Sequence, residues 1–158
     1  MSIGDDFANG RYKVLHKLGF GGSSTVWLAR DSASKTLVAL KVLSANESSK
    51  PKDEIAELSI SPKLDALIAS THNAAWNSIQ TITDSFTVKG PNGTHLCLVF
   101  PPPGPSVHGM SFGCEGRTEG SRRLRADLAR KVAKQTAAVM ELMHSAGHVH
   151  GGTPDLHS

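Results

Sequence analysis

The sequence lacks the features that would assign it at once to a membrane, secreted or disulfide-rich class. It has no apolar run approaching the roughly 18 residues that a membrane-spanning helix needs. Its opening segment, MSIGDDFANG, has no apolar stretch of the kind found in signal peptides. Cys97 and Cys114 are too few for a disulfide framework or a zinc site made of cysteines alone. We therefore expect no membrane partner and a location in the cytoplasm, the nucleus or both.

The excess of positive over negative charge is also small, because 17 Lys and Arg against 14 Asp and Glu give a net charge of +3. A basic segment lies within residues 122–134, but the solvated face of a helix explains it more simply than contacts to phosphates do. Aromatic residues make up 5% of the chain, so few rings could stack on bases. We expect no nucleic-acid partner. The basic residues of this segment are Arg122, Arg123, Arg125, Arg130, Lys131 and Lys134.

Short strands joined by tight turns are predicted over most of residues 11–100. The evidence is apolar alternation, clusters of β-branched residues, and turn signals such as Asn92-Gly93 between two apolar runs. Tight turns between consecutive strands favour an antiparallel sheet. The predicted strands cover residues 11–18, 25–29, 37–43, 79–88 and 94–100.

Two helices are predicted outside these strands. Residues 53–61 form a short helix that Pro62 ends or kinks, because proline cannot donate the helical hydrogen bond. The preceding residues 44–52 are polar and are predicted as a loop. Apolar residues at helical spacing predict a long helix over 122–145, which Gly147 ends.

A glycine-rich segment joins the first two predicted strands. Small residues let backbone amides come close to an anion such as a triphosphate, which suggests a nucleotide site. A plain hairpin turn would also explain them, so this motif alone leaves both interpretations open. The segment reads Leu18-Gly19-Phe20-Gly21-Gly22-Ser23-Ser24-Thr25-Val26.

A lysine lies within the third predicted strand, in the sequence Val38-Ala39-Leu40-Lys41. A lysine inside an apolar strand is costly unless an anion pairs with it. A nucleotide phosphate could supply that anion, and Glu57 on the short helix could hold the ammonium in place. A lysine at the edge of a strand that reaches solvent is the simpler alternative.

Together these motifs resemble the N-lobe of eukaryotic protein kinases. More narrowly, the chain resembles the SR-protein-specific serine/threonine kinases and their fungal relatives, over roughly residues 8–158. Ser24 replaces the third glycine of the usual loop, as is typical of that group. The segments that carry the resemblance are HKLGFGGSSTVWLAR, VALKVL, GPNGTHLCLVF and MHSAGHVHG.

The resemblance implies an α+β fold. Its N-lobe would be a five-stranded antiparallel sheet with one helix, followed by a loop and one long helix of an incomplete C-lobe. The implied divisions are an N-terminal extension over 1–10, an N-lobe over 11–100, a hinge and linker over 101–121, and a partial C-lobe over 122–158.

The resemblance also implies a function, the transfer of phosphate from ATP to Ser or Thr of proteins, with Mg²⁺ as the family's metal ion. Val26 and Ala39 would enclose the adenine, and Phe100 would be the gatekeeper behind it. Lys41 would hold the α- and β-phosphates and pair with Glu57. The implied nucleotide-binding residues are Leu18, Gly19, Phe20, Gly21, Gly22, Ser23, Ser24, Thr25, Val26, Ala39 and Lys41.

The sequence departs from the family pattern at the hinge and on the short helix. The hinge reads Phe100-Pro101-Pro102-Pro103-Gly104, and prolines have no N–H to donate to adenine. We expect weakened adenine recognition. Ser61, one turn after Glu57, stands where the family has an apolar packing residue. We expect the short helix to be poorly anchored and the pair of Lys41 and Glu57 to be loosely held.

The catalytic loop also departs from the family pattern. In a gapless alignment, Gly152 takes the place of the catalytic aspartate. With an insertion of three residues, Asp155 takes that place, and this alignment is favoured because Leu156 and His157 then match as well. The family explains His150 and His157 without a metal. Gly147 separates His144 from His148, so we expect no metal site.

The sequence ends at Ser158, before the Asp-Phe-Gly motif of the family. We therefore expect the Mg²⁺ ligands to be missing and this chain by itself to be inactive. The surface for the family's Ser/Arg-rich protein substrates would also lie in the missing part. The alternative to a kinase is a pseudokinase fragment that binds nucleotide or protein.

Overall fold

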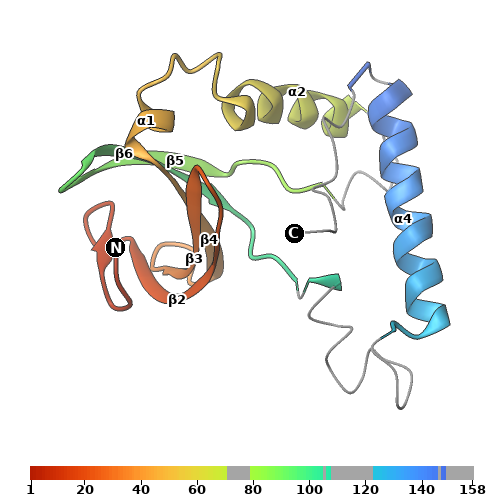
Figure 1. Cartoon of the computed structure of the whole chain (residues 1–158), viewed down its shortest axis with the longest axis horizontal. Coiled ribbons are helices and arrows are strands. Elements are labelled where there is room, and N and C mark those ends of the chain that lie inside the picture. Colours follow the sequence, from red (N-terminus) through yellow and green to blue (C-terminus); the bar gives the residue numbers. More distant parts are fainter. Residues whose placement is uncertain (71–78, 105, 108–122, 146, 149–158) are drawn as a thin grey trace. The chain divides into compact units, whose positions relative to one another are not determined.

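The computed structural model describes residues 1–70, 79–104, 106–107, 123–145 and 147–148. The chain divides into two compact units. The first comprises residues 1–66 and 80–103 and contains the sheet. The second comprises residues 67–79 and 104–158 and contains the long helix (Figure 1).

A six-stranded antiparallel sheet dominates the first unit, with the strand order β1-β2-β3-β4-β6-β5. The predicted α+β fold is confirmed. Five of the strands correspond to the predicted ones, and the two-residue strand β1 is additional because so short a segment has no periodicity to read. The strands are β1 (Asp6–Phe7), β2 (Tyr12–Phe20), β3 (Ser24–Asp31), β4 (Leu37–Leu43), β5 (Asp84–Gly90) and β6 (Gly93–Phe100).

Strand β1 covers one end of the outer edge of β2. Phe7 pairs with Tyr12. The backbone of Val14 also exchanges two bonds with the segment before β1: Gly4 N–H donates to Val14 O, and Val14 N–H donates to Asp5 O, both at 2.9 Å. The first residues of the chain are therefore part of the folded sheet rather than an extension beside it.

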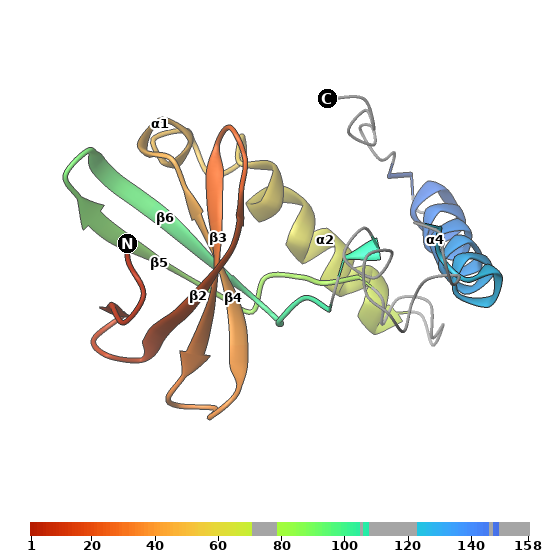
Figure 2. The ribbon, with the colours of Figure 1, turned by 60° about the horizontal axis from the view of Figure 1, so that its bottom comes forward.

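The sheet is strongly curled. In Figure 2, β5 and β6 run at a steep angle to β2, β3 and β4. Tyr12 of β2 and Phe86 of β5 stack with ring centroids 5.3 Å apart, although three strands separate them in the sheet. The concave face therefore closes on its own side chains. Its buried residues are Tyr12, Ala29, Val38, Leu40 and Val99, with Phe7, Trp27 and Phe86 packed against them.

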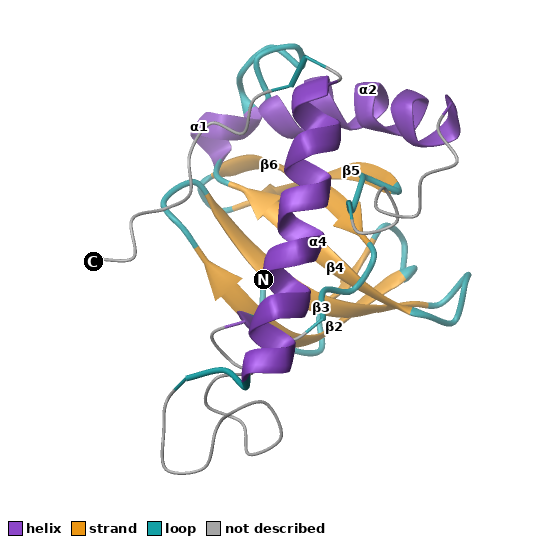
Figure 3. Ribbon diagram, turned by 90° about the vertical axis from the view of Figure 1, so that its right-hand side faces the viewer, coloured by secondary structure: helices purple, strands orange, loops and turns teal. Residues whose placement is uncertain are grey.

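The opposite face of the sheet packs against helical residues. Leu43 and Leu98 form a buried cluster with Ile55, which precedes the helix α2 (Ala56–Ser70). The short helix α1 (Ala45–Ser48) lies on the same side, next to β6 (Figures 1 and 3). One face of the sheet therefore encloses a core of its own side chains, and the other face packs against the helical segments.

Two predictions in the first half of the chain, a loop over 44–52 and a short helix over 53–61, need correction. Residues 44–52 contain α1, because Ser44 caps it: the Ser44 hydroxyl accepts from Glu47 N–H at 3.3 Å. Helix α2 begins at Ala56 rather than at residue 53 and continues through Pro62 to Ser70, so the expectation that Pro62 ends the helix is wrong. Proline removes one helical hydrogen bond, and burial of Leu64 on the following turn outweighs that loss.

Helix α4 (Ala126–Ser145) corresponds to the long helix predicted over 122–145. Its end at Gly147 is confirmed. Gly147 has φ +76° and donates to His144 O at 3.0 Å, while His148 N–H donates to Met143 O at 2.8 Å. This pair of bonds is a Schellman motif, which favours glycine because of the left-handed backbone. No helix in the described part of the chain is long and apolar enough to cross a membrane.

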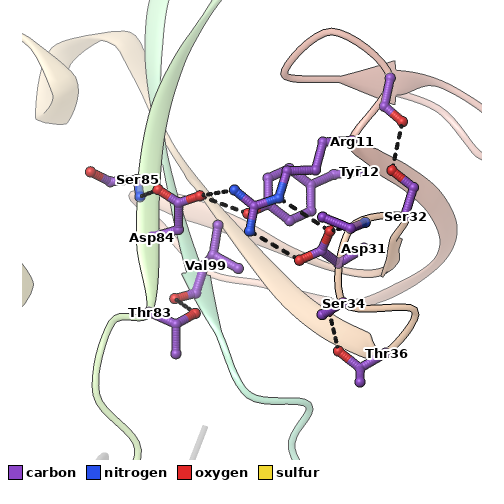
Figure 4. Close-up of polar contacts among 12 residues, drawn as sticks. Arg11, Tyr12, Asp31, Ser32, Ser34, Thr36, Thr83, Asp84, Ser85 and Val99 are labelled. Carbon is purple, nitrogen blue, oxygen red and sulfur yellow. Dashed lines mark hydrogen bonds and ion pairs between the residues drawn. The ribbon is translucent and has the colours of Figure 1, made fainter.

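A polar network ties the two sides of the curled sheet together (Figure 4). Arg11 donates two hydrogen bonds of 3.1 Å to the buried Asp31 and one of 2.7 Å to Asp84. The Tyr12 hydroxyl donates to Asp84 at 2.8 Å. The hydrogen bonds from Arg11 lower the pKa of Asp31 to about 2. Burial raises the pKa of Tyr12, so its hydroxyl stays a donor at neutral pH.

This network predicts a specific dependence of stability on acid. The pKa of Asp31 is about 2 in the folded protein, below the ordinary value of 3.8. Its contribution to stability is therefore complete above about pH 4 and disappears as the pH falls through about 2. We expect Asp31→Asn to lower the urea midpoint at pH 5, with the difference from the parent shrinking toward pH 2. Circular dichroism during urea titrations measures it.

Asp65→Asn is the matched control, because Asp65 is an exposed carboxylate outside the network. It should leave the urea midpoint nearly unchanged throughout. A loss of stability in Asp31→Asn that is the same at pH 5 and pH 2 would contradict the assigned role of the ionised carboxylate.

Candidate functional site

The candidate site lies on the face of the sheet that is opposite to the concave core. Val26 pairs with Lys41, and Lys41 pairs with Leu98, so these three side chains form one row across β3, β4 and β6. Ala39 pairs with Phe100 two residues further along. Because side chains alternate along a strand, Lys41 and Ala39 share this face with Val26. The register therefore brings the predicted adenine and phosphate residues together.

Lys41 and Glu57 form a hydrogen-bonded ion pair between Nζ and Oε1. Both side chains are partly buried, with 28% and 30% of their surfaces exposed. Burial raises the pKa of Glu57, but the hydrogen bond and the positive charge of Lys41, together with a backbone hydrogen bond, lower it by more, so the pKa lies below its ordinary value. The carboxylate is therefore ionised at neutral pH and holds the lysine ammonium on the sheet face.

Ser61 anchors the helix that carries Glu57. Its side chain is buried, and its hydroxyl accepts a 2.8 Å hydrogen bond from Ile82 N–H. The expectation of a short, poorly anchored helix is therefore wrong: a polar bond replaces the apolar contact that the family pattern has there. The same bond explains why β5 begins at Asp84 rather than at residue 79, since the N–H of Ile82 is used outside the sheet.

The glycine-rich segment forms the turn between β2 and β3. Gly21 N–H donates to Ser24 O at 2.8 Å, which closes the turn. A Cβ atom added to Gly19, Gly21 or Gly22 would meet nothing within 4 Å. These three glycines therefore have open space beside their backbone. Phe20 at its start is 81% exposed, and Leu18 is 42% exposed.

Phe100 lies at the end of β6, at the border of a cavity of about 320 Å³. Helix α2 and Ile82 form the other walls, with Ser61 among the lining residues. Pro101, Pro102 and Pro103 follow Phe100 and are exposed. They offer no N–H, and the carbonyl of Pro102 accepts a long hydrogen bond of 3.5 Å from Gln80.

The candidate catalytic residue Asp155 lies outside the described residues, as do Gly152 and His150. The two alignments of this segment therefore remain predictions. Among the residues that the structure describes, no group of three or more His, Cys, Asp or Glu side chains could hold a metal ion.

The hydrogen bond from Ile82 to Ser61 could not be predicted from the sequence. Residues 79–88 were predicted as a continuous strand, which gave no reason to expect a free N–H at Ile82 for Ser61. Pro62, which follows Ser61, favours the end of a helix. It does not predict a helix that continues and whose serine hydroxyl accepts a hydrogen bond from the segment before β5.

Comparison with known proteins gives consistent similarities. The chain is 33% identical to "Protein kinase dsk1" of Schizosaccharomyces pombe over 149 residues, which cover 94% of this chain and 26% of that protein. It is 33% identical to "Serine/threonine-protein kinase spk-1" of Caenorhabditis elegans over 153 residues, or 95% of this chain and 14% of that protein. It is 39% identical to the human "SRSF protein kinase 3" over 101 residues, or 63% of this chain and 17% of that protein.

The chain therefore spans about a quarter or less of the length of these relatives. No protein-family model matches it. The similarity to dsk1 and spk-1 nevertheless covers both compact units, because it extends over nearly the whole chain.

The anchoring role of Ser61 can be tested by deleting its hydroxyl. Ser61→Ala leaves the N–H of Ile82 without its partner, and we expect a loss of about 1 kcal/mol in the free energy of unfolding. Ser59→Ala is the control, because the Ser59 hydroxyl donates only to Ala56 O of its own helix. Urea denaturation measures both variants. Equal stabilities of the two variants would show that the bond from Ile82 to Ser61 contributes nothing.

Proposed function

Because the chain is homologous to serine/threonine protein kinases of the SR-protein-kinase type, we propose that it is the nucleotide-binding lobe of such a kinase. In this proposal ATP binds to the sheet face that carries Lys41. The observation that carries it is the ion pair between Lys41 and Glu57. A lysine that merely reached solvent would need no carboxylate partner, whereas one that binds phosphate must be held in place.

The phosphate end of the nucleotide fits the residues present. Lys41 offers an ammonium whose position is fixed by Glu57, and an ammonium is a suitable partner for phosphate oxygens. The glycines of the turn after β2 have open space beside their backbone, which lets a phosphate approach the turn closely. Lys41 would therefore bind and orient the phosphates, and Glu57 would keep Lys41 from turning toward solvent.

The adenine end fits less well. Val26 and Ala39 offer apolar surface on the same sheet face as Lys41. The three prolines after Phe100 remove the backbone donors with which a hinge would recognise the base. We propose that binding depends mainly on the phosphates and only weakly on the identity of the base.

Unlike the phosphates, a magnesium ion finds no suitable site among the described residues. Mg²⁺ supplies charge neutralisation at the phosphate oxygens in protein kinases. No described group of acidic side chains could hold it, so we derive no step through it. We propose that this chain by itself binds nucleotide without transferring phosphate, which is the behaviour of a pseudokinase-like binding module. Phosphorylation of Ser/Arg-rich proteins would belong to a longer kinase.

Replacement of Lys41 is the direct test of the site. We expect the full 158-residue chain to bind ATP, and Lys41→Met to weaken binding about ten- to a hundredfold, because a charge-assisted contact to phosphate is lost. Isothermal calorimetry with and without Mg²⁺ measures it. Lys63→Met, on the exposed side of α2, is the matched control and should bind like the parent. Absence of ATP binding by a folded parent chain would overturn the proposal.

The hinge prolines lead to a second prediction. With few donors for the base, we expect ATP and GTP to bind with dissociation constants within about tenfold of each other, which corresponds to less than about 1.4 kcal/mol. Competition of both nucleotides against a fluorescent ADP analogue measures the ratio. Preference for ATP by several orders of magnitude would mean that another group recognises adenine.

A further inference from the structure

Three consecutive prolines follow the last strand of the sheet, and the binding of a nucleotide makes no use of them. Pro101, Pro102 and Pro103 come directly after Phe100, the final residue of β6. All three are exposed, as is Gly104 after them. The chain forms no helix, strand or turn over these four residues, and it can be followed from the end of β6 in Figure 1. We call Pro101–Pro103 the proline segment.

The sequence restricts the backbone of the proline segment to one conformation. A proline ring fixes φ at about −65°, and a residue that precedes a proline is confined to extended values of ψ. Both restrictions act on Pro101 and on Pro102, because each is a proline and each precedes one. The result is the polyproline II helix, an extended left-handed helix without internal hydrogen bonds. The segment therefore holds its backbone open to a partner.

The proline segment offers hydrogen-bond acceptors but no donors. Proline has no N–H, so its backbone can only accept hydrogen bonds. The carbonyl of Pro102 accepts one long bond, of 3.5 Å, from the Gln80 amide. Within the described part of the chain, the carbonyls of Pro101 and Pro103 accept none. A partner of this segment must therefore bring the donors itself.

The sequence around the proline segment carries no formal charge. Residues 96–107 contain no Asp, Glu, Lys or Arg. A partner that depended on ion pairs, such as a charged peptide or a nucleic acid, would find no opposite charge in this stretch of the chain. The interactions that remain are apolar packing on the proline rings and hydrogen bonds to the backbone carbonyls.

We propose that the proline segment binds a partner protein whose surface carries a groove lined by tyrosine and tryptophan side chains. The aromatic faces of the groove pack on the exposed proline rings. The tyrosine O–H and tryptophan N–H groups of the groove donate to the carbonyls of Pro101 and Pro103. Grooves lined by aromatic residues are the general means by which proteins recognise polyproline II segments.

The fold holds the proline segment in place at its beginning. Phe100 pairs with Ala39 in the sheet and borders the cavity beside α2. Gln80 adds its hydrogen bond to Pro102. Because the segment is already extended and attached to the sheet, little conformational entropy is lost when a groove binds it, and this favours binding.

The test is a binding measurement against domains that carry grooves of this kind. An array of purified SH3, WW and EVH1 domains is probed with the fluorescently labelled full chain, in the absence of nucleotide. We expect saturable binding to at least one domain of the array. The double variant Pro102→Ala with Pro103→Ala should bind that domain about tenfold more weakly, because alanine keeps the carbonyl but lacks the ring and its fixed φ.

Two controls make the result specific. The double variant Pro51→Ala with Pro91→Ala removes two exposed prolines outside the segment and should bind like the parent. Binding by the parent should change by less than about twofold when the salt is raised from about 0.15 M to about 0.5 M, because no ion pair forms. If the hinge variant fails to fold by circular dichroism, the peptide acetyl-Leu-Val-Phe-Pro-Pro-Pro-Gly-amide replaces the chain. A peptide with alanine in place of its second and third prolines should then bind more weakly.

Absence of binding to every domain of the array by a folded parent chain would overturn the proposal and leave the prolines as a stiff spacer. Equal binding by the parent and the hinge variant would overturn it as well, as would loss of binding at the higher salt concentration. The measurement contains no nucleotide, so its result is independent of whether ATP binds at Lys41.

Discussion

The stacking of Tyr12 on Phe86 is the contact on which the rest of the first unit depends. It joins strands that three others separate, and it can form only if the sheet curls. Asp84 reinforces it by accepting from the Tyr12 hydroxyl and from Arg11. Once the concave face is closed in this way, the opposite face is left to the helices and to the row of side chains that contains Lys41.

That division explains how a single ammonium group is held in place on the surface of a small sheet. Lys41 extends from a strand in which four of the other six residues are buried, so its backbone is rigid. Its partner, Glu57, extends from a helix that is held by Ile55 and by the hydroxyl of Ser61. Two rigid supports on two sides therefore define the position of a single charge pair.

The sequence predicted the sheet well, because its strands carry local signals that tertiary packing does not override. Alternation in β2, the β-branched residues of β3 and the turn at Asn92-Gly93 each identify one strand or hairpin. The resemblance to protein kinases predicted the pair of Lys41 and Glu57. Neither the partial burial of this pair nor the anchoring of the helix of Glu57 by Ser61 could be predicted from the sequence. Pro62 was misleading, because a helix survives the loss of one hydrogen bond when the next turn is buried. Asp155 stays a prediction.

The short strand β1 has a consequence for solubility. An uncovered strand edge presents unpaired N–H and C=O groups, which readily accept a strand from another molecule. Here the backbone groups of Val14 are already used by Gly4 and Asp5, and Phe7 packs on the concave core. The opening residues therefore protect the protein against self-association. A protein without them would expose both an unpaired strand edge and the aromatic side chains that Phe7 covers.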